Sequence, residues 1–208
     1  MGDDRINWSS RGDCWGPGVC QTGPARVELR LRDGLVRKVE VLRRMERPAS
    51  DAVDLGAVSP EAAVSYFLDL ARTGGSSGRE LEEAVFPVIL ADVDSVWRDL
   101  LALARDRSVG ADTRSSALFW VSQEAAAVVT EGLARVALDE EEDQDVREAA
   151  VFALSQRPDV EGVPVLMEVA RTARHPETRE AAMFWLAQSE DERILNFFEE
   201  ILLGKGGG

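Results

Sequence analysis

The sequence is poor in the residue types that build most catalytic and metal sites. Its 208 residues include one histidine, two cysteines and two lysines, whereas arginine occurs 22 times. The single histidine, His175, excludes a multi-histidine iron site and leaves one imidazole for any Ser-His-Asp arrangement. Because a proline follows it, we expect His175 to lie in a turn before a helix. The sequence therefore predicts no catalytic residue, no metal and no cofactor, and a protein that is not an enzyme.

Long apolar runs are absent as well. No stretch approaches the ~18 apolar residues that a membrane-spanning helix needs, so we expect no membrane span. The first residues, Met1 to Asp4, lack the charged and apolar regions of a signal peptide. This start indicates either a cytosolic protein or a mature form whose original start has been replaced.

Positive charge is scarce outside the first quarter of the chain. The formal net charge is −14, and residues 51–208 hold 14 Arg and Lys against 31 Asp and Glu. Residues 1–50 are slightly basic, with ten Arg and Lys against seven Asp and Glu. A nucleic-acid-binding surface needs a basic stripe that neutralises phosphates. We therefore exclude DNA and RNA as partners.

The two cysteines bear on the compartment. Cys14 and Cys20 lie in a turn-rich stretch, and a disulfide that closes this short loop is sterically plausible. Such a bond forms in an oxidising compartment. The alternative is two reduced thiols in a cytosolic loop. We predict the disulfide, which slightly favours an extracytoplasmic or periplasmic location over the cytoplasm.

The N-terminal part differs in pattern from the rest. Residues 1–50 are interpreted as an irregular arm that holds a β-hairpin over about 26–42, because two alternating runs flank Asp33-Gly34. Residues 51–78 are interpreted as a linker and a capping helix, which begins at Ser59-Pro60. Residues 204–208 are expected to form a flexible tail.

A three-residue phrase, Ala-x-Phe, recurs through the remainder at steps of 33, 33 and 32 residues. Periods of this length indicate stacked helix pairs. The pattern predicts a mainly α fold, an α-solenoid of about four helix pairs over residues 79–203. The four copies of the phrase are Ala84-Val85-Phe86, Ala117-Leu118-Phe119, Ala150-Val151-Phe152 and Ala182-Met183-Phe184.

The repeated residues have expected structural roles. We expect the recurring Ala to let neighbouring helices approach closely and the Phe to be buried in the core. A second set of anchors recurs at the same period in the following helices, as Leu100, Leu133 and Leu166. Trp120 and Trp185 occupy equivalent positions two repeats apart. They either balance small residues inside the core or form a face that grips a partner.

An arginine precedes the Ala by three residues in the last three copies. Arg114, Arg147 and Arg179 are predicted to form a structural ladder, each bridging to a carboxylate or carbonyl of the next repeat. The acids just before them suit helix N-termini. These acids are Asp112, Asp145 and Glu177. A row of arginines presented to an acidic ligand is the alternative.

The densest charge run spans residues 139–145, where six of seven residues are acidic. A calcium loop would need a central Gly and a terminal Glu, and this run has neither. We therefore expect a solvated loop between repeats.

Two segments carry a resemblance to a known family. Residues 145–150 read Asp-Val-Arg-Glu-Ala-Ala and residues 177–182 read Glu-Thr-Arg-Glu-Ala-Ala. Together with Val163-Pro164-Val165-Leu166 they resemble the HEAT-like repeat family, in the variant first noted in phycobilin lyases, over about residues 79–203. Leu81 and Leu202 depart from the pattern, as end repeats often do, so we expect a whole stack. The resemblance implies a protein-binding scaffold rather than chemistry.

These observations lead to one main functional prediction and two alternatives. The main prediction is a non-enzymatic scaffold or adaptor that binds another protein or peptide through a solenoid face. The first alternative is a lyase-like protein that handles a ligand or chromophore. A deep pocket lined by Trp120, Trp185 and acidic groups would favour it. The second is a structural subunit of an extracytoplasmic assembly, in which the basic arm of one copy pairs with the acidic repeats of another. Self-association is expected in that case.

Overall fold

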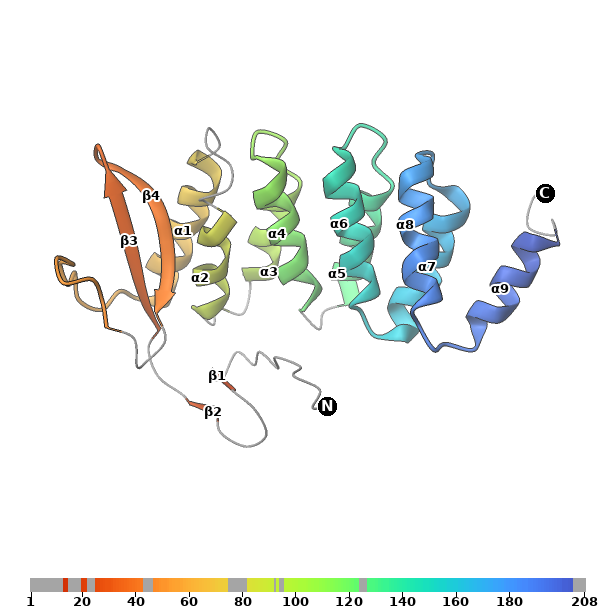
Figure 1. Cartoon of the computed structure of the whole chain (residues 1–208), viewed down its shortest axis with the longest axis horizontal. Helices are drawn as coiled ribbons and strands as arrows, with labels where there is room; N and C mark the ends of the chain where they lie inside the picture. Colours follow the sequence, from red (N-terminus) through yellow and green to blue (C-terminus); the bar gives the residue numbers. More distant parts are fainter. Residues whose placement is uncertain are drawn as a thin grey trace. The chain divides into compact units, whose positions relative to one another are not determined.

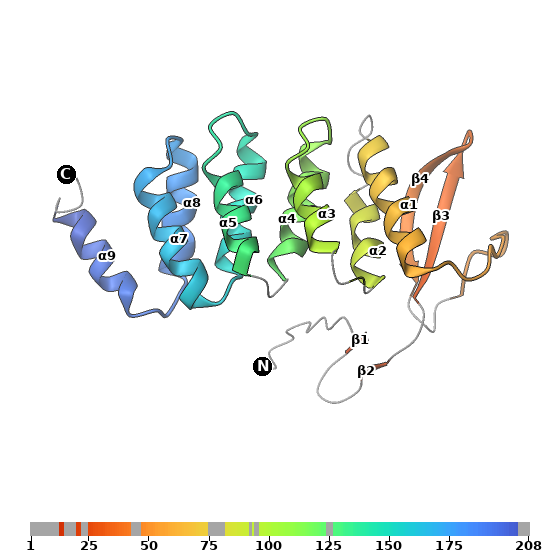
Figure 2. The same ribbon diagram turned by 180° about the vertical axis from the view of Figure 1, so that it is seen from behind.

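The computed structural model describes residues 13–14, 20–21, 25–42, 47–74, 82–91, 93, 96–123 and 127–203. Its contacts divide the chain into two compact units, Met1–Val96 and Trp97–Gly208. Figures 1 and 2 show the elements of each unit from opposite sides. The fold is an α-solenoid with an N-terminal β-hairpin, so the predicted fold class is confirmed. The domain boundaries predicted from the sequence are based on its repeats, whereas these two units are based on contacts in space. The predicted boundaries therefore stay predictions.

Among its described residues, the first unit has two antiparallel strand pairs. The short strands β1 (Asp13–Cys14) and β2 (Cys20–Gln21) pair with each other. The longer strands β3 (Arg26–Arg32) and β4 (Leu35–Leu42) form the hairpin predicted at about 26–42. Its turn places Asp33 and Gly34 at positive φ, 55° and 75°, which explains why the turn uses Asp-Gly.

Helices follow the hairpin in the same unit. Helix α1 (Pro60–Thr73) begins at the predicted place, because the Ser59 hydroxyl accepts a hydrogen bond from the Ala62 N–H at 3.2 Å. It packs against the short helices η2 (Glu82–Ala84) and α2 (Val85–Leu90). Strand β4 also contacts η2, so the hairpin has a partner within its own unit.

In its described residues, the second unit consists of helices joined by turns and short connections. It begins within α3 (Val96–Ala104), at Trp97, and continues as three helix pairs that match the predicted repeats. The pairs are α4 (Ala111–Ser122) with α5 (Ala127–Ala137), α6 (Gln144–Ser155) with α7 (Asp159–Thr172), and α8 (Pro176–Ala187) with α9 (Arg193–Leu202).

The first helices of the pairs form one layer and the second helices another. Helix α4 contacts α6, and α6 contacts α8, whereas α5 contacts α7. Figure 1 shows α4, α6 and α8 side by side, and Figure 2 shows α5 and α7 from behind. This is the stacking that a period of about 33 residues predicts. Among the described residues, no helix has the length and apolar character needed to span a membrane.

The core of the second unit lies between the two layers. The recurring alanines Ala117, Ala150 and Ala182 are completely buried, as predicted from close helix approach. The second anchor set is buried too, with Leu133 at 0% and Leu166 at 2% exposure. A small side chain at the helix contact and a leucine filling the layer therefore explain both recurring positions.

The recurring phenylalanines are not core residues in this unit, and that expectation was wrong. Phe119 is 38% exposed and Phe184 is 56% exposed, while Phe152 is half-buried. The helical period explains the difference, since two positions along a helix turn the side chain by about 200°. A buried Ala therefore directs the Phe of the same phrase to the outer face.

Several expectations fall on residues outside the described ranges. They are most of the irregular arm before residue 25, the helix break at 75–78 and the tail at 204–208. Leu81, one of the two departures from the repeat pattern, also lies outside them.

Candidate functional site

The first rung of the predicted ladder is a buried ion pair. Arg114, in the first turn of α4, donates to Glu142 and Asp143, which end the turn between α5 and α6. Its Nε also donates to the carbonyl of Val109 at 3.0 Å. The guanidinium thus joins its own turn to the turn of the next repeat.

The other two arginines bind carbonyls and a hydroxyl. Arg147 donates to the carbonyl of Glu142, and to Thr178 Oγ1 of the next repeat at 3.2 Å. Arg179 donates to the carbonyls of Ala173 and Arg174 at 2.8 and 2.9 Å, in the turn that precedes its own helix. The predicted bridge to the next repeat is therefore confirmed at Arg114. At Arg147 the acceptor in the next repeat is a hydroxyl, and at Arg179 the prediction was wrong, because this side chain binds the turn before its own helix.

The acids that accompany these arginines lie at exposed positions. Asp112, Asp145 and Glu177 all lie in the first turns of their helices and are exposed. They favour the helix N-termini, where the dipole is positive. Because the arginines bond elsewhere, these carboxylates remain on the outer face.

The acidic run at 139–145 is not uniformly solvated. Glu142 is 7% exposed, and its carboxylate pairs with Arg114. This ion pair fixes the middle of the loop. Asp139 and Glu141 bind Arg107 of the preceding turn at 2.8 and 3.0 Å. Within the described ranges, no three or more His, Cys, Asp and Glu side chains gather closely enough to hold a metal ion.

A further buried arginine was missed by the sequence reasoning. Arg157, after α6, donates to the Ser122 carbonyl at 3.1 Å, to Thr130 Oγ1 at 3.2 Å and to Glu161 at 2.8 Å. The hydrogen bond from Arg157 lowers the pKa of the Glu161 carboxyl. Residue 157 carries no repeat signal, because the equivalent residues in the other pairs are not arginine. Periodicity could not have found it.

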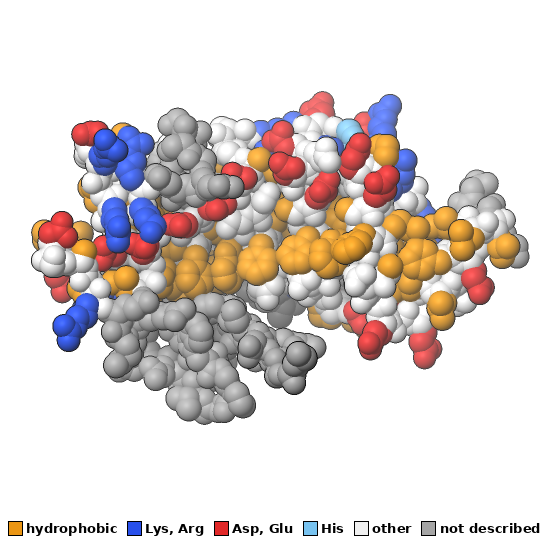
Figure 3. Space-filling model, viewed as in Figure 1, with side chains coloured by type: hydrophobic (Ala, Val, Ile, Leu, Met, Phe, Trp, Pro, Cys, Tyr) orange, Lys and Arg blue, Asp and Glu red, His pale blue; other side chains and the backbone are white. Residues whose placement is uncertain are grey.

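The phenylalanines and tryptophans of the second unit form an aromatic stripe, which we define as Phe119, Trp120, Phe152, Phe184 and Trp185. Phe119 stacks on Phe152 with ring centroids 6.2 Å apart and planes 4° from parallel. Phe152 meets Trp185 at 5.0 Å. Each tryptophan also meets the phenylalanine beside it, at 5.0 Å in α4 and 5.1 Å in α8. The stripe runs across α4, α6 and α8 on their outer face (Figure 3).

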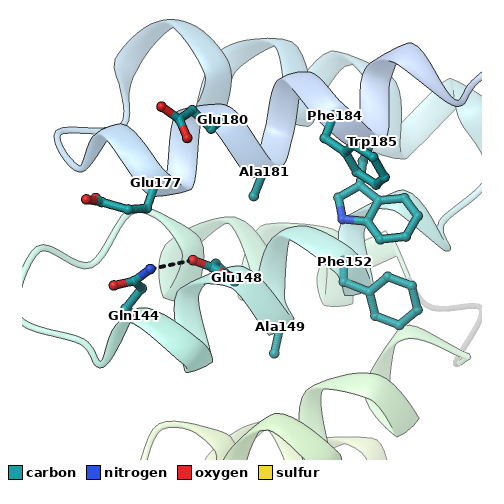
Figure 4. Close-up of a pocket in the computed structure, with 9 residues that line it drawn as sticks. All are labelled: Gln144, Glu148, Ala149, Phe152, Glu177, Glu180, Ala181, Phe184 and Trp185. Atoms are coloured by element: carbon teal, nitrogen blue, oxygen red, sulfur yellow. Dashed lines mark hydrogen bonds between the residues drawn. The ribbon is translucent and has the colours of Figure 1, made fainter.

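A groove crosses this face between α6 and α8. It has a volume of about 610 Å³ and is open to solvent. Figure 4 shows carboxylates at one end, alanines in the middle and aromatic rings at the other end. The lining residues are Gln144, Glu148, Ala149, Phe152, Glu177, Glu180, Ala181, Phe184 and Trp185. Trp120 does not line the groove, so the two tryptophans do not enclose one ligand.

Three further residues were singled out from the sequence, two cysteines and the histidine. Cys14 and Cys20 pair as backbone neighbours across β1 and β2, but their side chains lie outside the described residues. The predicted disulfide therefore stays a prediction. His175 occupies the N-cap of α8, and its Nε2 lies 3.0 Å from the carbonyl of Glu140. It holds a turn, as its position before Pro176 indicated.

Comparison with known proteins supports the repeat architecture. A family model of HEAT repeats matches residues 130–205, which include α6 to α9. HEAT repeats are commonly protein-interaction scaffolds. The match concerns these repeats in general, so the phycobilin-lyase type stays a prediction. No curated protein and no solved structure matches the chain.

Proposed function

We propose that the protein is a non-enzymatic scaffold that binds another protein or peptide through the outer face of α4, α6 and α8. The observation that carries the proposal is the aromatic stripe. Phe184 is 56% exposed and Phe119 is 38% exposed, although the neighbouring alanines of the same phrases are buried. Exposed aromatic side chains are the residue type that dominates the energetics of protein interfaces.

The continuity of the stripe supports a binding role. Isolated exposed apolar residues are common on protein surfaces and need no explanation. Here, rings from three successive repeats contact one another, from Phe119 through Phe152 to Trp185. A contiguous apolar surface with a polar border is typical of an interaction site.

The shape of the face favours a peptide or protein over a small ligand. Sites for small molecules are usually deep and bury most of the ligand surface. The groove between α6 and α8 is open, and Trp120 lies outside it. The lyase-like alternative, which would need Trp120 and Trp185 in one deep pocket, has less support from this geometry. The structural-subunit alternative predicts that copies of the protein associate with each other.

The proposal is tested by selecting binding peptides from a displayed random library against the purified chain. Affinities of the selected peptides are then compared by fluorescence polarisation for the wild type and a Phe119→Ser/Phe184→Ser variant. We expect the variant to bind at least about tenfold more weakly. The matched control is Val160→Ser, which removes a 77% exposed apolar side chain from α7.

Two outcomes would contradict the proposal. Peptides that bind the stripe variant as well as the wild type would place the site elsewhere. Equal losses in the stripe variant and in Val160→Ser would indicate nonspecific adhesion. Salt-sensitive dimers seen by light scattering would instead support the structural-subunit alternative.

A further inference from the structure

The carboxylates beside the aromatic stripe have no basic neighbours on the same helices. Helices α4, α6 and α8 contain three arginines, and all three donate into turns: Arg114, Arg147 and Arg179. The acids of the same helices, in contrast, are exposed or half-buried on the outer face. They are Asp112, Asp145, Glu148, Glu177 and Glu180. On these helices the guanidinium groups are thus engaged with turns, whereas the carboxylates are exposed or half-buried.

Three of these acids lie at one end of the groove. Glu148, Glu177 and Glu180 line it together with Gln144, whose Nε2 donates to Glu148 at 2.8 Å. Figure 3 shows acidic side chains along one border of the stripe over α6 and α8. The surrounding unit has the same sign, since residues 97–208 hold 12 Arg and Lys against 22 Asp and Glu. The local and the overall fields therefore both attract a cation.

From this arrangement we propose that the groove between α6 and α8 binds a basic, apolar segment of a partner protein. This inference rests on the proposed function of the face. An Arg or Lys of the segment pairs with Glu148, Glu177 and Glu180, and an apolar side chain packs on Phe152, Phe184 and Trp185. Acidic proteins, nucleic acids and anionic lipid surfaces are repelled by the same carboxylates.

The helix geometry sets the spacing within the segment. Glu148 precedes Phe152 by four residues and Glu177 precedes Trp185 by eight, which correspond to about 6 and 12 Å along a helix. An extended peptide advances about 3.3 Å per residue. The cationic and apolar residues of the segment are therefore about two to four positions apart.

Arginine fits this groove better than lysine. Its guanidinium pairs with carboxylates in a bidentate manner and also stacks on aromatic rings. The protein already makes such a contact internally, because Arg171 lies over the ring of Phe197 at 4.7 Å. An arginine can therefore pair with the carboxylates at one end of the groove, or stack on the rings where it lies beside them.

The experiment uses three synthetic peptides with a Gly/Ser background. The first carries arginines, each followed three positions later by leucine; the second has Glu in place of Arg, and the third has Ser in place of Leu. Binding to the full chain is measured by titration, with the tryptophan indole signals in NMR spectra as the readout. We expect saturable binding of the first peptide only, weakened by added salt.

A charge-neutralised protein separates the partner class from the proposed function. We expect Glu148→Gln/Glu177→Gln/Glu180→Gln to bind the Arg–Leu peptide about tenfold more weakly. The control Glu168→Gln removes an exposed acid from α7, in the other layer, and should bind like the wild type.

The results that would overturn the inference are distinct from those that would overturn the proposed function. Equal binding of the Glu–Leu peptide, no saturable binding of the Arg–Leu peptide, or unchanged affinity in the triple variant would each exclude a basic partner. If library-selected peptides still depend on Phe119 and Phe184, the scaffold function stands and only the partner class is wrong. If they do not, both fail.

Discussion

Arg114 and Glu142 are 28 residues apart in the chain and pair with each other although both side chains are almost completely buried. Arg114 belongs to one repeat and Glu142 to the turn that opens the next. Burying two charges is costly, and the pair is tolerated because further hydrogen bonds satisfy the guanidinium. The contact fixes how two successive repeats meet.

Removing one member of this pair should strongly destabilise the protein. We expect Arg114→Met to lower the free energy of unfolding by about 3–5 kcal/mol, because the Glu142 carboxylate is then buried without its partner. Glu142→Gln should cost less, because Asp143 still pairs with Arg114. Urea unfolding followed by circular dichroism measures the change. Arg135→Met breaks the exposed pair with Glu131 and should cost about 0.5 kcal/mol or less. Similar losses in both cases would show that the buried pair is unimportant.

The phenylalanines of the stripe should contribute little to stability. Phe184→Ser removes a side chain that is 56% exposed, so we expect a loss of about 1 kcal/mol or less. Leu154→Ala empties a completely buried position and should cost about 2–5 kcal/mol. Thermal and urea unfolding of both variants decide the point. If Phe184→Ser lowers the free energy of unfolding as much as Leu154→Ala does, Phe184 is a core residue and the description of it as exposed is wrong.

Two helical glycines should respond differently to alanine. A Cβ at Gly162 would lie 2.5 Å from the backbone oxygen of Leu154, which cannot move away without disturbing α6. At Gly132 the nearest atoms belong to the Leu101 side chain, at 2.7 Å, which can rotate. Alanine gains up to about 1 kcal/mol of helix propensity at either site.

We therefore expect Gly162→Ala to lower the melting temperature and Gly132→Ala to leave it nearly unchanged. Differential scanning calorimetry of the two variants gives the comparison. A stabilised Gly162→Ala variant would mean that α6 and α7 are less closely packed than described.

The lowered pKa of the Asp191 carboxyl leads us to expect that the stability of the protein depends on pH. Hydrogen bonds from Arg193 lower the pKa of Asp191 from 3.8 to about 2. The larger effect comes from the Arg193 side chain and the smaller one from its backbone N–H. A lowered pKa means that the folded state prefers the carboxylate. The stabilisation is thus complete above about pH 4 and is lost as the pH falls towards 2.

Asp191→Asn should accordingly lower the melting temperature at pH 6, and the difference from the wild type should shrink as the pH approaches 2. The melting temperatures of both proteins across this range provide the measurement. A difference that does not vary with pH would show that the carboxylate charge is not involved.

The cysteines can be examined without a partner. We expect Cys14 and Cys20 to be oxidised, since β1 and β2 make them cross-strand neighbours. Thiol titration of the unfolded chain, purified without reductant, should then find no free thiol, and prior reduction should release both. Two titratable thiols before reduction would favour the reduced, cytosolic alternative.

Local patterns were sufficient for the hairpin, the helices and their order, but they did not predict the short pair β1 and β2. Asp33-Gly34 determined the hairpin turn, Ser59 with Pro60 determined the start of α1, and the period of Ala117 and Ala150 determined the stacked pairs. In each case the physical cause acts within a few residues or repeats at a fixed spacing. Such causes can therefore be recognised in a single sequence.

The candidate site was only partly predictable. The spacing of Trp120 and Trp185 allows a partner face as one alternative, but the sequence pattern predicts that the phenylalanines beside them are buried. The sequence shows that Phe119 and Phe152 are apolar and periodic, and both burial and an exposed stripe would satisfy that pattern. Which face of α6 meets the second layer depends on the neighbouring helices.

By itself, then, the sequence determined the repeat, its length, the hairpin and the acidic charge, because these follow from composition and periodicity. The tertiary structure alone decided that Ala150 is buried and Phe152 is on the outer face, and that Arg157 joins three segments up to 35 residues apart. Side-chain direction and long-range hydrogen bonds depend on how the repeats pack against each other, and this packing produces no periodic pattern in the sequence. The proposed binding face exists because the arginines turn inward and the aromatic rings turn outward.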